Sequence, residues 1–164
     1  MARRPAPGRR PGRTGRTVRT GRSPGAGRPV TGGSPCPCGG SAPYGSCCGR
    51  FHTGAETVGA GATPPTAELL MRSRYSAFVV LDAAYLLRTW DPATRPARLD
   101  LDPETRWQGL EVLATTDGSA FHTTGTVTFR ARFTDDGRPG ELHERSRFAR
   151  HAGAWVYVDG TFLD

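Results

Sequence analysis

The sequence predicts an α+β fold in which one or two N-terminal helices pack on a curved antiparallel sheet. Two observations predict it. Apolar side chains recur with a helical period between residues 66 and 90, and from residue 107 onward the period changes to two, as it does in half-buried strands. Because the helical part comes first and the strands follow in one run, the pattern is typical of an α+β domain.

The helical segment has signals at both ends and one in its middle. Thr66 can cap the first turn through its hydroxyl, and Glu68 lies in that turn, where the positive end of the helix dipole favours an acid. We expect a break near Asp82 to divide the segment into two helices. Pro92 ends it, because the residue before a proline avoids the helical conformation. The side chains expected on one apolar face are Met71, Tyr75, Phe78 and either Leu81 or Tyr85.

Four strands are expected after the helices. In the second strand the odd-numbered residues from Phe121 to Phe133 form the apolar face, and in the third Glu144 lies on the apolar face between Leu142 and Phe148. Turns are expected where Gly, Asp and Pro residues cluster. The strands are predicted over 107–116, 120–133, 141–151 and 154–163, with turns at 117–118, 134–140 and 152–153.

The excess positive charge lies in the first part of the chain. Residues 1–33 carry nine arginines and no acidic residue, whereas residues 34–164 hold 13 arginines against 15 acidic residues. A segment of this composition cannot bury enough apolar surface to offset its ordering entropy, so residues 1–33 are predicted to be a disordered Arg/Gly/Pro-rich tail. Two interpretations of the tail remain open: a phosphate-binding arm that contacts RNA or ribosomes, and a dispensable extension or start-site artefact.

The apolar pattern predicts no membrane span. No run of 18 apolar residues occurs, and no apolar stretch follows the basic N-terminus as it would in a secretory signal. We therefore expect a cytoplasmic protein. The expected organisation is the tail over 1–33, a cysteine-rich knuckle over 34–53, a Gly/Ala/Thr/Pro linker over 54–65 and the α+β domain over 66–164.

All four cysteines lie in the stretch CPCGGSAPYGSCC. Its spacing, C-x-C, eight residues and then C-C, lets four thiolates close a tetrahedron around Zn²⁺ at about 2.3 Å. Disulfides are disfavoured in a cytoplasmic protein, and free thiols would have no reason to cluster. His52 is a lesser alternative for one ligand. A closed shell leaves no position for water, so the zinc is expected to be structural, held by Cys36, Cys38, Cys47 and Cys48.

The cysteine stretch resembles the SEC-C motif, the zinc knuckle at the C-terminus of the SecA translocation motor. The segments LLMRSRYSAFV, YLLRTW, WQGLEVL, VTFRARF, HERSRF and WVYVDG resemble the bacterial YchJ family in that order, so the resemblance covers about residues 34–160. It implies a cytoplasmic protein that joins a SEC-C knuckle to a nuclear-transport-factor-2-like domain, a cone of curved sheet capped by helices. The SEC-C module of SecA is implicated in contacts with the SecB chaperone and with ribosomes, which implies a protein partner here. Some relatives carry a second knuckle at the C-terminus, whereas this chain has no cysteine after Cys48.

A cone of this kind often holds a pocket between helix and sheet. We hypothesise that Arg74 and Glu144 pair inside the cone, because a carboxylate on an apolar face must be paired or shifted in pKa. A purely structural ion pair is the alternative interpretation, and tryptophans are often core residues. The candidate pocket residues are Arg72, Arg74, Tyr75, Trp90, Trp107 and Glu144.

Three classes of function follow from these features. The favoured class is an adaptor that docks on a protein partner through the knuckle, since a closed metal site has no catalytic position. The second is a small-molecule binder or enzyme that uses the cone, with Glu144 or Asp82 as general acid or base. No serine triad, phosphate-binding loop or open metal site supports an enzyme, and the catalytic residues stay unassigned. The third class is an RNA-associated protein that acts through the tail.

Overall fold

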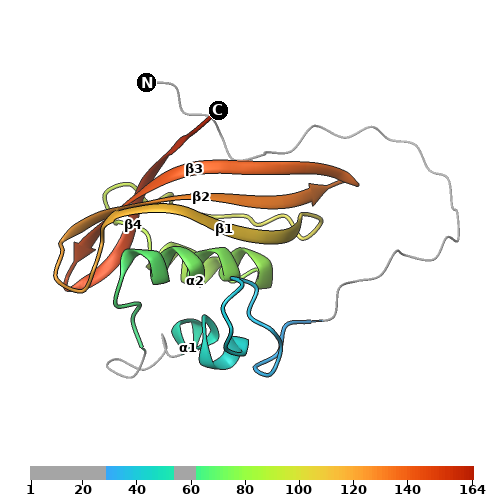
Figure 1. Ribbon diagram of the computed structural model, residues 1–164, viewed down its shortest axis with the longest axis horizontal. Coiled ribbons are helices and arrows are strands. Elements are labelled where there is room, and N and C mark those ends of the chain that lie inside the picture. The colour runs from blue at the N-terminus through green and yellow to red at the C-terminus, as the bar shows by residue number, and fades with distance from the viewer. Residues whose placement is uncertain (1–28, 54–61) are drawn as a thin grey trace, which may run out of the picture.

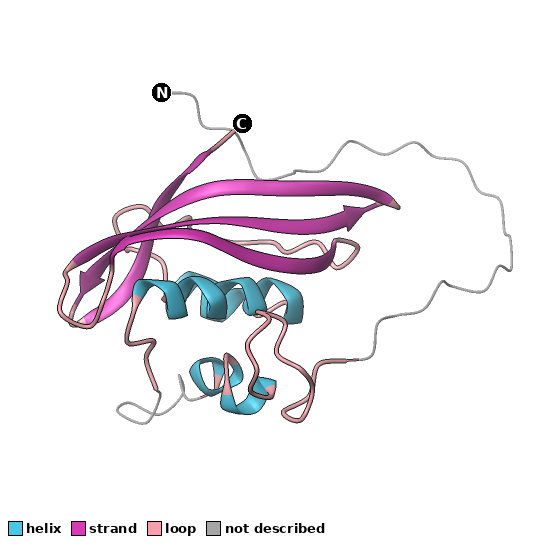
Figure 2. Ribbon diagram, in the orientation of Figure 1, coloured by secondary structure: helices cyan, strands magenta, loops and turns pink. Residues whose placement is uncertain are grey.

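The computed structural model describes residues 29–53 and 62–164. Figure 1 shows three layers: the sheet, then α2, then the segment that carries α1. Figure 2 shows the helices gathered on one face of the sheet. The predicted tail and linker fall mostly outside the described residues and stay predictions. The elements in chain order are η1 (Tyr44–Ser46), α1 (Gly49–His52), α2 (Ala67–Val80), α3 (Ala83–Arg88), β1 (Arg106–Asp117), β2 (Thr124–Asp135), β3 (Arg138–His151) and β4 (Ala154–Phe162).

The predicted helical segment forms two helices. The hydroxyl of Thr66 accepts a hydrogen bond from the amide of Leu69 at 3.2 Å and so caps α2, as predicted. α2 ends at Val80, and its capping residue Leu81 adopts the left-handed conformation with a φ of 61°. The carboxylate of Asp82 then accepts from the amide of Tyr85 at 2.9 Å and caps α3. The break near Asp82 is confirmed. The carboxylate of Asp82 caps the first turn of α3, and this role accounts for an acid at that position.

The strands form one antiparallel sheet in the order β1-β2-β3-β4. Asp136–Gly137 connects β2 to β3, Ala152–Gly153 connects β3 to β4, and all four residues have positive φ. Two-residue turns of this kind match the right-handed twist of the strands they join. The predicted turn at Ala152–Gly153 is confirmed. The predicted turn over 134–140 is too long, because Asp135 and Arg138 already pair across the hairpin.

One face of the sheet packs against α2, as the period of two predicts. In β2 and β3 the alternation is confirmed: Val127 is buried on this face together with the carboxylate of Glu144. The prediction that Phe121 lies on the apolar face is wrong, since its side chain is 97% exposed. The β2 ladder begins only at Thr124, and Phe121 lies in the preceding loop, where alternation no longer holds. The main core consists of Ala67, Leu70, Met71, Tyr75, Val127, Phe129, Ala131, Phe148 and Trp155.

The chain that follows α3 lies along β4. The amide of Tyr157 donates to the carbonyl of Thr89 at 2.8 Å, and the amide of Asp91 donates to the carbonyl of Tyr157 at 2.7 Å. These bonds hold Trp90 beside the sheet, with its ring centroid 5.1 Å from that of Tyr157. The helical layer and the last strand are therefore joined at this point by backbone hydrogen bonds and an aromatic contact.

Candidate metal centre

Backbone hydrogen bonds bring the two cysteine pairs together. The amide of Tyr44 donates to the carbonyl of Ser34 at 2.8 Å, and the amide of Gly45 donates to the carbonyl of Gly32 at 2.9 Å. The chain therefore folds back on itself between the pairs. Gly39 makes the turn after the first pair with a φ of 81°, a conformation that side chains disfavour.

The four cysteine sulfurs lie within 4.8 Å of one another. The Sγ atoms of Cys38 and Cys47 are 3.6 Å apart. A tetrahedron with metal–sulfur bonds of about 2.3 Å has edges of about 3.8 Å, so the cluster has the size that such an ion requires. No disulfide joins any of the four cysteines, so all four sulfurs are available as ligands. The donor set fits a metal ion that prefers tetrahedral sulfur coordination, and it leaves no ligand position for water.

The thiols of this cluster influence one another's ionisation. Hydrogen bonding by Cys48 is the main cause that lowers the pKa of Cys38, to about 5. Burial is the main cause that raises the pKa of Cys47 to about 11, and hydrogen bonding to Cys38 raises the pKa of Cys48. The thiolate of Cys38 is therefore favoured, and its negative charge disfavours ionisation of the neighbouring thiols. A divalent cation removes that opposition, because it stabilises several thiolates at once.

The knuckle, residues 34–53, does not stand apart from the domain. Phe51 is buried in a cluster with Ala77, Tyr85 and Leu86 from α2 and α3. The guanidinium of Arg88 donates to the backbone carbonyls of Phe51 and of His52, each at 3.0 Å, and so covers the end of α1. One face of the knuckle is thus fixed on the two helices by apolar packing and by a cation at the negative end of a short helix.

His52 is a second anchor of the knuckle and not a metal ligand. Its Nε2 lies 2.8 Å from the carbonyl oxygen of Ser73, which can only accept, so Nε2 carries the proton and donates. Its Nδ1 then accepts from the hydroxyl of Tyr44 at 2.6 Å. Both ring nitrogens are engaged with protein groups, and burial lowers the pKa of this imidazole. The lesser alternative, His52 in place of one thiolate, finds no support in this geometry.

The six candidate pocket residues lie in three places. Tyr75 and Trp107 meet in the core between α2 and β1, with ring centroids 5.8 Å apart. Arg72 lies on the knuckle side of α2, where it pairs with Glu68 and donates to the carbonyl of Cys38 at 3.1 Å. The remaining three, Arg74, Trp90 and Glu144, gather around Tyr157.

Arg74 and Glu144 are both buried, at 4% and 8% exposure, but the hypothesis that they pair is wrong. Within the described chain no ion pair joins the two heads. The Nη1 of Arg74 donates to the carbonyl of Leu86 at 2.7 Å and to the hydroxyl of Thr89 at 2.8 Å. Glu144 accepts from the hydroxyl of Ser146 at 2.7 Å. Oxygen acceptors at the end of α3 thus bind the guanidinium of Arg74. Burial lowers the pKa of Arg74 to about 10, which still leaves the side chain charged at neutral pH.

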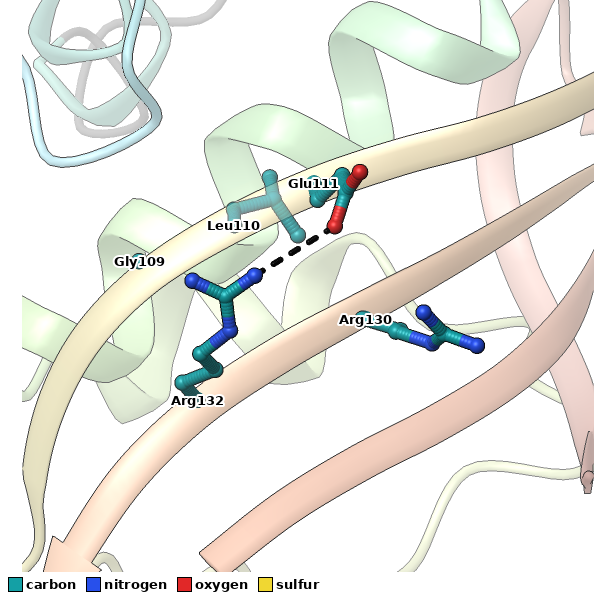
Figure 3. A pocket seen from close by; sticks show the side chains of 5 residues that line it. All are labelled: Gly109, Leu110, Glu111, Arg130 and Arg132. Carbon is teal, nitrogen blue, oxygen red and sulfur yellow. Dashed lines mark ion pairs between the residues drawn. The ribbon is translucent and has the colours of Figure 1, made fainter. Parts of the chain in front are cut away.

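A shallow hollow of about 170 Å³ opens on the opposite face of the sheet, between β1 and β2. Arg132 lies 3.5 Å from the carboxylate of Glu111. Figure 3 shows this pair, with Arg130 alongside. Both arginines also lie near Glu141, at 3.5 and 3.8 Å, so their charges are largely balanced. None of the six candidate pocket residues lines this hollow.

The cysteine knuckle and the helix-capped sheet define a SEC-C motif joined to a nuclear-transport-factor-2-like domain. Residues 66–160 match the family model described as "YchJ, middle NTF2-like domain". The chain belongs to the YchJ family, also designated UPF0225. A UPF0225 protein of Streptomyces coelicolor is 69% identical over 121 residues, which is 74% of this chain and 90% of that protein. Another, from Ralstonia nicotianae, is 49% identical over 71% of this chain and 84% of its own length.

Two solved structures support the same assignment. The solution structure of RPA3114, a SEC-C motif containing protein from Rhodopseudomonas palustris, is 32% identical and superposes with a TM-score of 0.65, covering 80% of this chain and all of that one. The crystal structure of a SEC-C motif containing protein from Psychrobacter arcticus is also 32% identical, with a TM-score of 0.60 over 79% of this chain and 82% of that one. Across the described residues, no helix combines the length and the apolar character needed to cross a bilayer.

Proposed function

We propose that this protein binds one structural Zn²⁺ through Cys36, Cys38, Cys47 and Cys48, and that it is an adaptor that docks on a protein partner through the exposed side of the knuckle. The observation that carries the proposal is the closed cluster of four sulfurs within 4.8 Å. Tetrahedral coordination by four cysteines is the usual geometry of structural zinc sites, and iron, which accepts the same geometry, is distinguished by elemental analysis. Such a site stabilises a fold and has no open position for a reaction.

The exposed side of the knuckle is defined by what the helices leave uncovered. The exposed residues of the knuckle are Pro35, Gly39, Gly40, Ser41, Pro43, Gly45, Ser46, Arg50 and Thr53. Residues 34–53 contain no Asp or Glu, and Arg50 is their single arginine. This surface combines small residues, which allow close approach of another backbone, with one guanidinium. It suits a partner that presents a carboxylate within a flat surface.

The metal is tested by elemental analysis of the purified, reduced protein. One zinc per chain supports the proposal, and a stoichiometric content of another metal or of none contradicts it. Replacing Cys47 with Ser should lower the zinc content, because serine is a poor zinc ligand.

The docking surface is tested by comparing R50E with R145E in the zinc-loaded protein. Arg145 is an exposed arginine on the opposite face of the sheet, so it is a matched control for the charge change. Partners captured from extract by the wild type and by R145E, but lost in R50E, are then purified and their direct binding is measured. Equal capture by both variants contradicts docking through the knuckle.

A second candidate function, a binder of small carboxylates, is favoured by one observation. Among the described residues, Trp90 Nε1 is the single buried side-chain nitrogen or oxygen that lacks a hydrogen-bond partner. The buried Arg74 lies over the Trp90 ring, 5.3 Å from its centroid. Among the described residues no ion pair joins it to an acid, although the nearby Glu144 opposes the larger effect of burial, which lowers the pKa of Arg74. A ligand that supplies an acceptor would satisfy Trp90 Nε1, and a carboxylate would place that acceptor beside the Arg74 cation. A thermal-shift screen of small carboxylates tests this idea, since a stabiliser of the wild type should have no effect on R74M. Contact with RNA or ribosomes through the tail stays a prediction of the sequence.

A further inference from the structure

Ser76 is a buried hydroxyl whose hydrogen-bond partner is a sulfur atom. It lies in the second half of α2, with 0% of its surface exposed. Its Oγ is 3.8 Å from the Sγ of Cys36, which is also buried. A serine inside a helix is less favourable than alanine by about 0.5 kcal/mol, and a buried hydroxyl needs a good acceptor. Local helix stability therefore does not explain why position 76 carries a serine and not an alanine.

The acceptor strength of the sulfur depends on its state. A neutral thiol accepts hydrogen bonds weakly, whereas a thiolate carries negative charge and accepts them well. We propose that Ser76 donates a hydrogen bond to the Cys36 thiolate of the metal centre, so that α2 supplies part of the shell around the ion. This inference rests on the proposed metal binding. It adds a group, outside the knuckle, that tunes the affinity for the ion.

Arg72 supports the same side of the centre. It precedes Ser76 by four residues, so the two side chains leave α2 on one face. Its Nη1 donates to the carbonyl of Cys38 at 3.1 Å, while its Nε and Nη2 contact Glu68 at 3.0 and 2.9 Å. The salt bridge with Glu68 holds the Arg72 guanidinium in place, and the guanidinium in turn holds the backbone of Cys38, a proposed metal ligand. A positive charge beside a centre with a net charge of about −2 also reduces its electrostatic cost.

The chain offers a matched control for Ser76. Ser73 is another fully buried serine of α2, and its hydroxyl contacts the carbonyl of Leu70 and the hydroxyl of Tyr85, at 2.9 and 2.7 Å. S73A removes a buried hydroxyl that does not contact sulfur. S76A removes one that does. If the inference holds, the two variants differ in metal affinity even where both change stability.

The experiment measures Zn²⁺ affinity by competition with a chromophoric chelator, and the absorption spectrum after loading with Co²⁺. We expect S76A to bind Zn²⁺ about 10-fold more weakly than the wild type. Its sulfur-to-cobalt charge-transfer band should move to lower energy, because the thiolate loses a donor. S73A should keep both the affinity and the band of the wild type. A folding defect alone does not move this band.

Each outcome decides between two statements. If the wild type binds Zn²⁺ but S76A and S73A match it in affinity and in the cobalt band, the role of Ser76 is wrong while the metal site stands. If the wild type binds neither ion, the proposed function and this inference both fail. R72M provides a second variant, with a weaker affinity expected, because Arg72 holds the backbone of the ligand Cys38.

Discussion

Arg74 and Glu144 contact the same side chain, Tyr157, and do not pair with each other. The Arg74 guanidinium lies 4.7 Å from the centroid of the tyrosine ring, and the tyrosine hydroxyl donates to Glu144 Oε1 at 3.3 Å. The aromatic ring presents its negative face to the cation, and the hydroxyl donates a hydrogen bond to the carboxylate. Tyr157 of β4 thus contacts both buried side chains, in addition to the acceptors that bind Arg74 and the Ser146 hydroxyl that binds Glu144.

Replacing Arg74 with Met should destabilise the fold by about 2 to 4 kcal/mol, because it leaves the carbonyl of Leu86 and the hydroxyl of Thr89 without a charged donor. Chemical denaturation measures the change. Arg95 is exposed and makes one longer contact, to the carbonyl of Leu87 at 3.4 Å, so R95M should cost less than about 0.5 kcal/mol. An equal loss in both variants would show that Arg74 has no special role.

Removing the metal should destabilise the whole domain and not the knuckle alone. All three tryptophans, Trp90, Trp107 and Trp155, lie outside the knuckle, so their fluorescence reports on the cone. At a free zinc concentration 1,000 times the dissociation constant, binding stabilises the native state by about 4 kcal/mol. We expect a chelator to lower the midpoint of the tryptophan transition, since the knuckle is packed on α2 and α3. An unchanged tryptophan transition contradicts this coupling.

Acidification should weaken the fold through His52. Burial lowers the pKa of this imidazole from 6.5, against smaller opposing effects of the Ser73 carbonyl and Asp82, while Arg88 adds to the lowering. The unfolded chain therefore binds the proton first, so the stability contributed by neutral His52 is present above pH 6.5 and is lost as the pH falls through the lower native pKa.

The pH dependence of the unfolding midpoint measures this effect by comparing the wild type with H52Q. Glutamine does not titrate, so the loss of stability below pH 6.5 should be smaller in H52Q than in the wild type. Zinc loss at low pH affects both proteins, and the difference between the two curves isolates the imidazole. Parallel curves would mean that His52 does not titrate differently on folding.

Replacing Gly160 with Ala should disturb Glu144. A Cβ at Gly160 would overlap Glu144 Oε1, so the carboxylate must shift, and its hydrogen bond with the hydroxyl of Ser146 is disturbed. We expect a loss of about 1 to 3 kcal/mol. In a double-mutant cycle, E144A should remove most of this cost. Gly109 has open space around its Cβ position, so G109A should be close to neutral, and an equal cost in both variants contradicts the contact.

Local patterns in the sequence predict most of the fold. The cap at Thr66, the break near Asp82, the alternation in β2 and β3 and the turn at Ala152–Gly153 depend on nearby residues, and the structure contains each of them. Phe121 shows the limit of such patterns. A loop can begin in the middle of an alternating stretch, because the pairing partner that starts the ladder lies elsewhere in the chain.

The site was only partly predictable for a physical reason. Four cysteines at a short spacing must lie close together, so their cluster follows from the sequence. The contacts that fix the knuckle on α2 and α3 use backbone carbonyls as acceptors, those of Cys38, Phe51, His52 and Ser73. A carbonyl is present at every residue, so no sequence pattern marks which ones an arginine or a histidine will reach. The one visible signal was a serine, Ser76, on a buried stretch of helix.

The burial of Phe51 has a consequence for the protein in the cell. This phenylalanine closes the cluster of Ala77, Tyr85 and Leu86, and it belongs to a short knuckle whose folding would depend on the proposed ion. A newly made chain that lacks the ion therefore leaves apolar helix surface open to proteases and chaperones. The supply of metal during growth should accordingly set the steady-state amount of this protein, and starvation should shorten its lifetime.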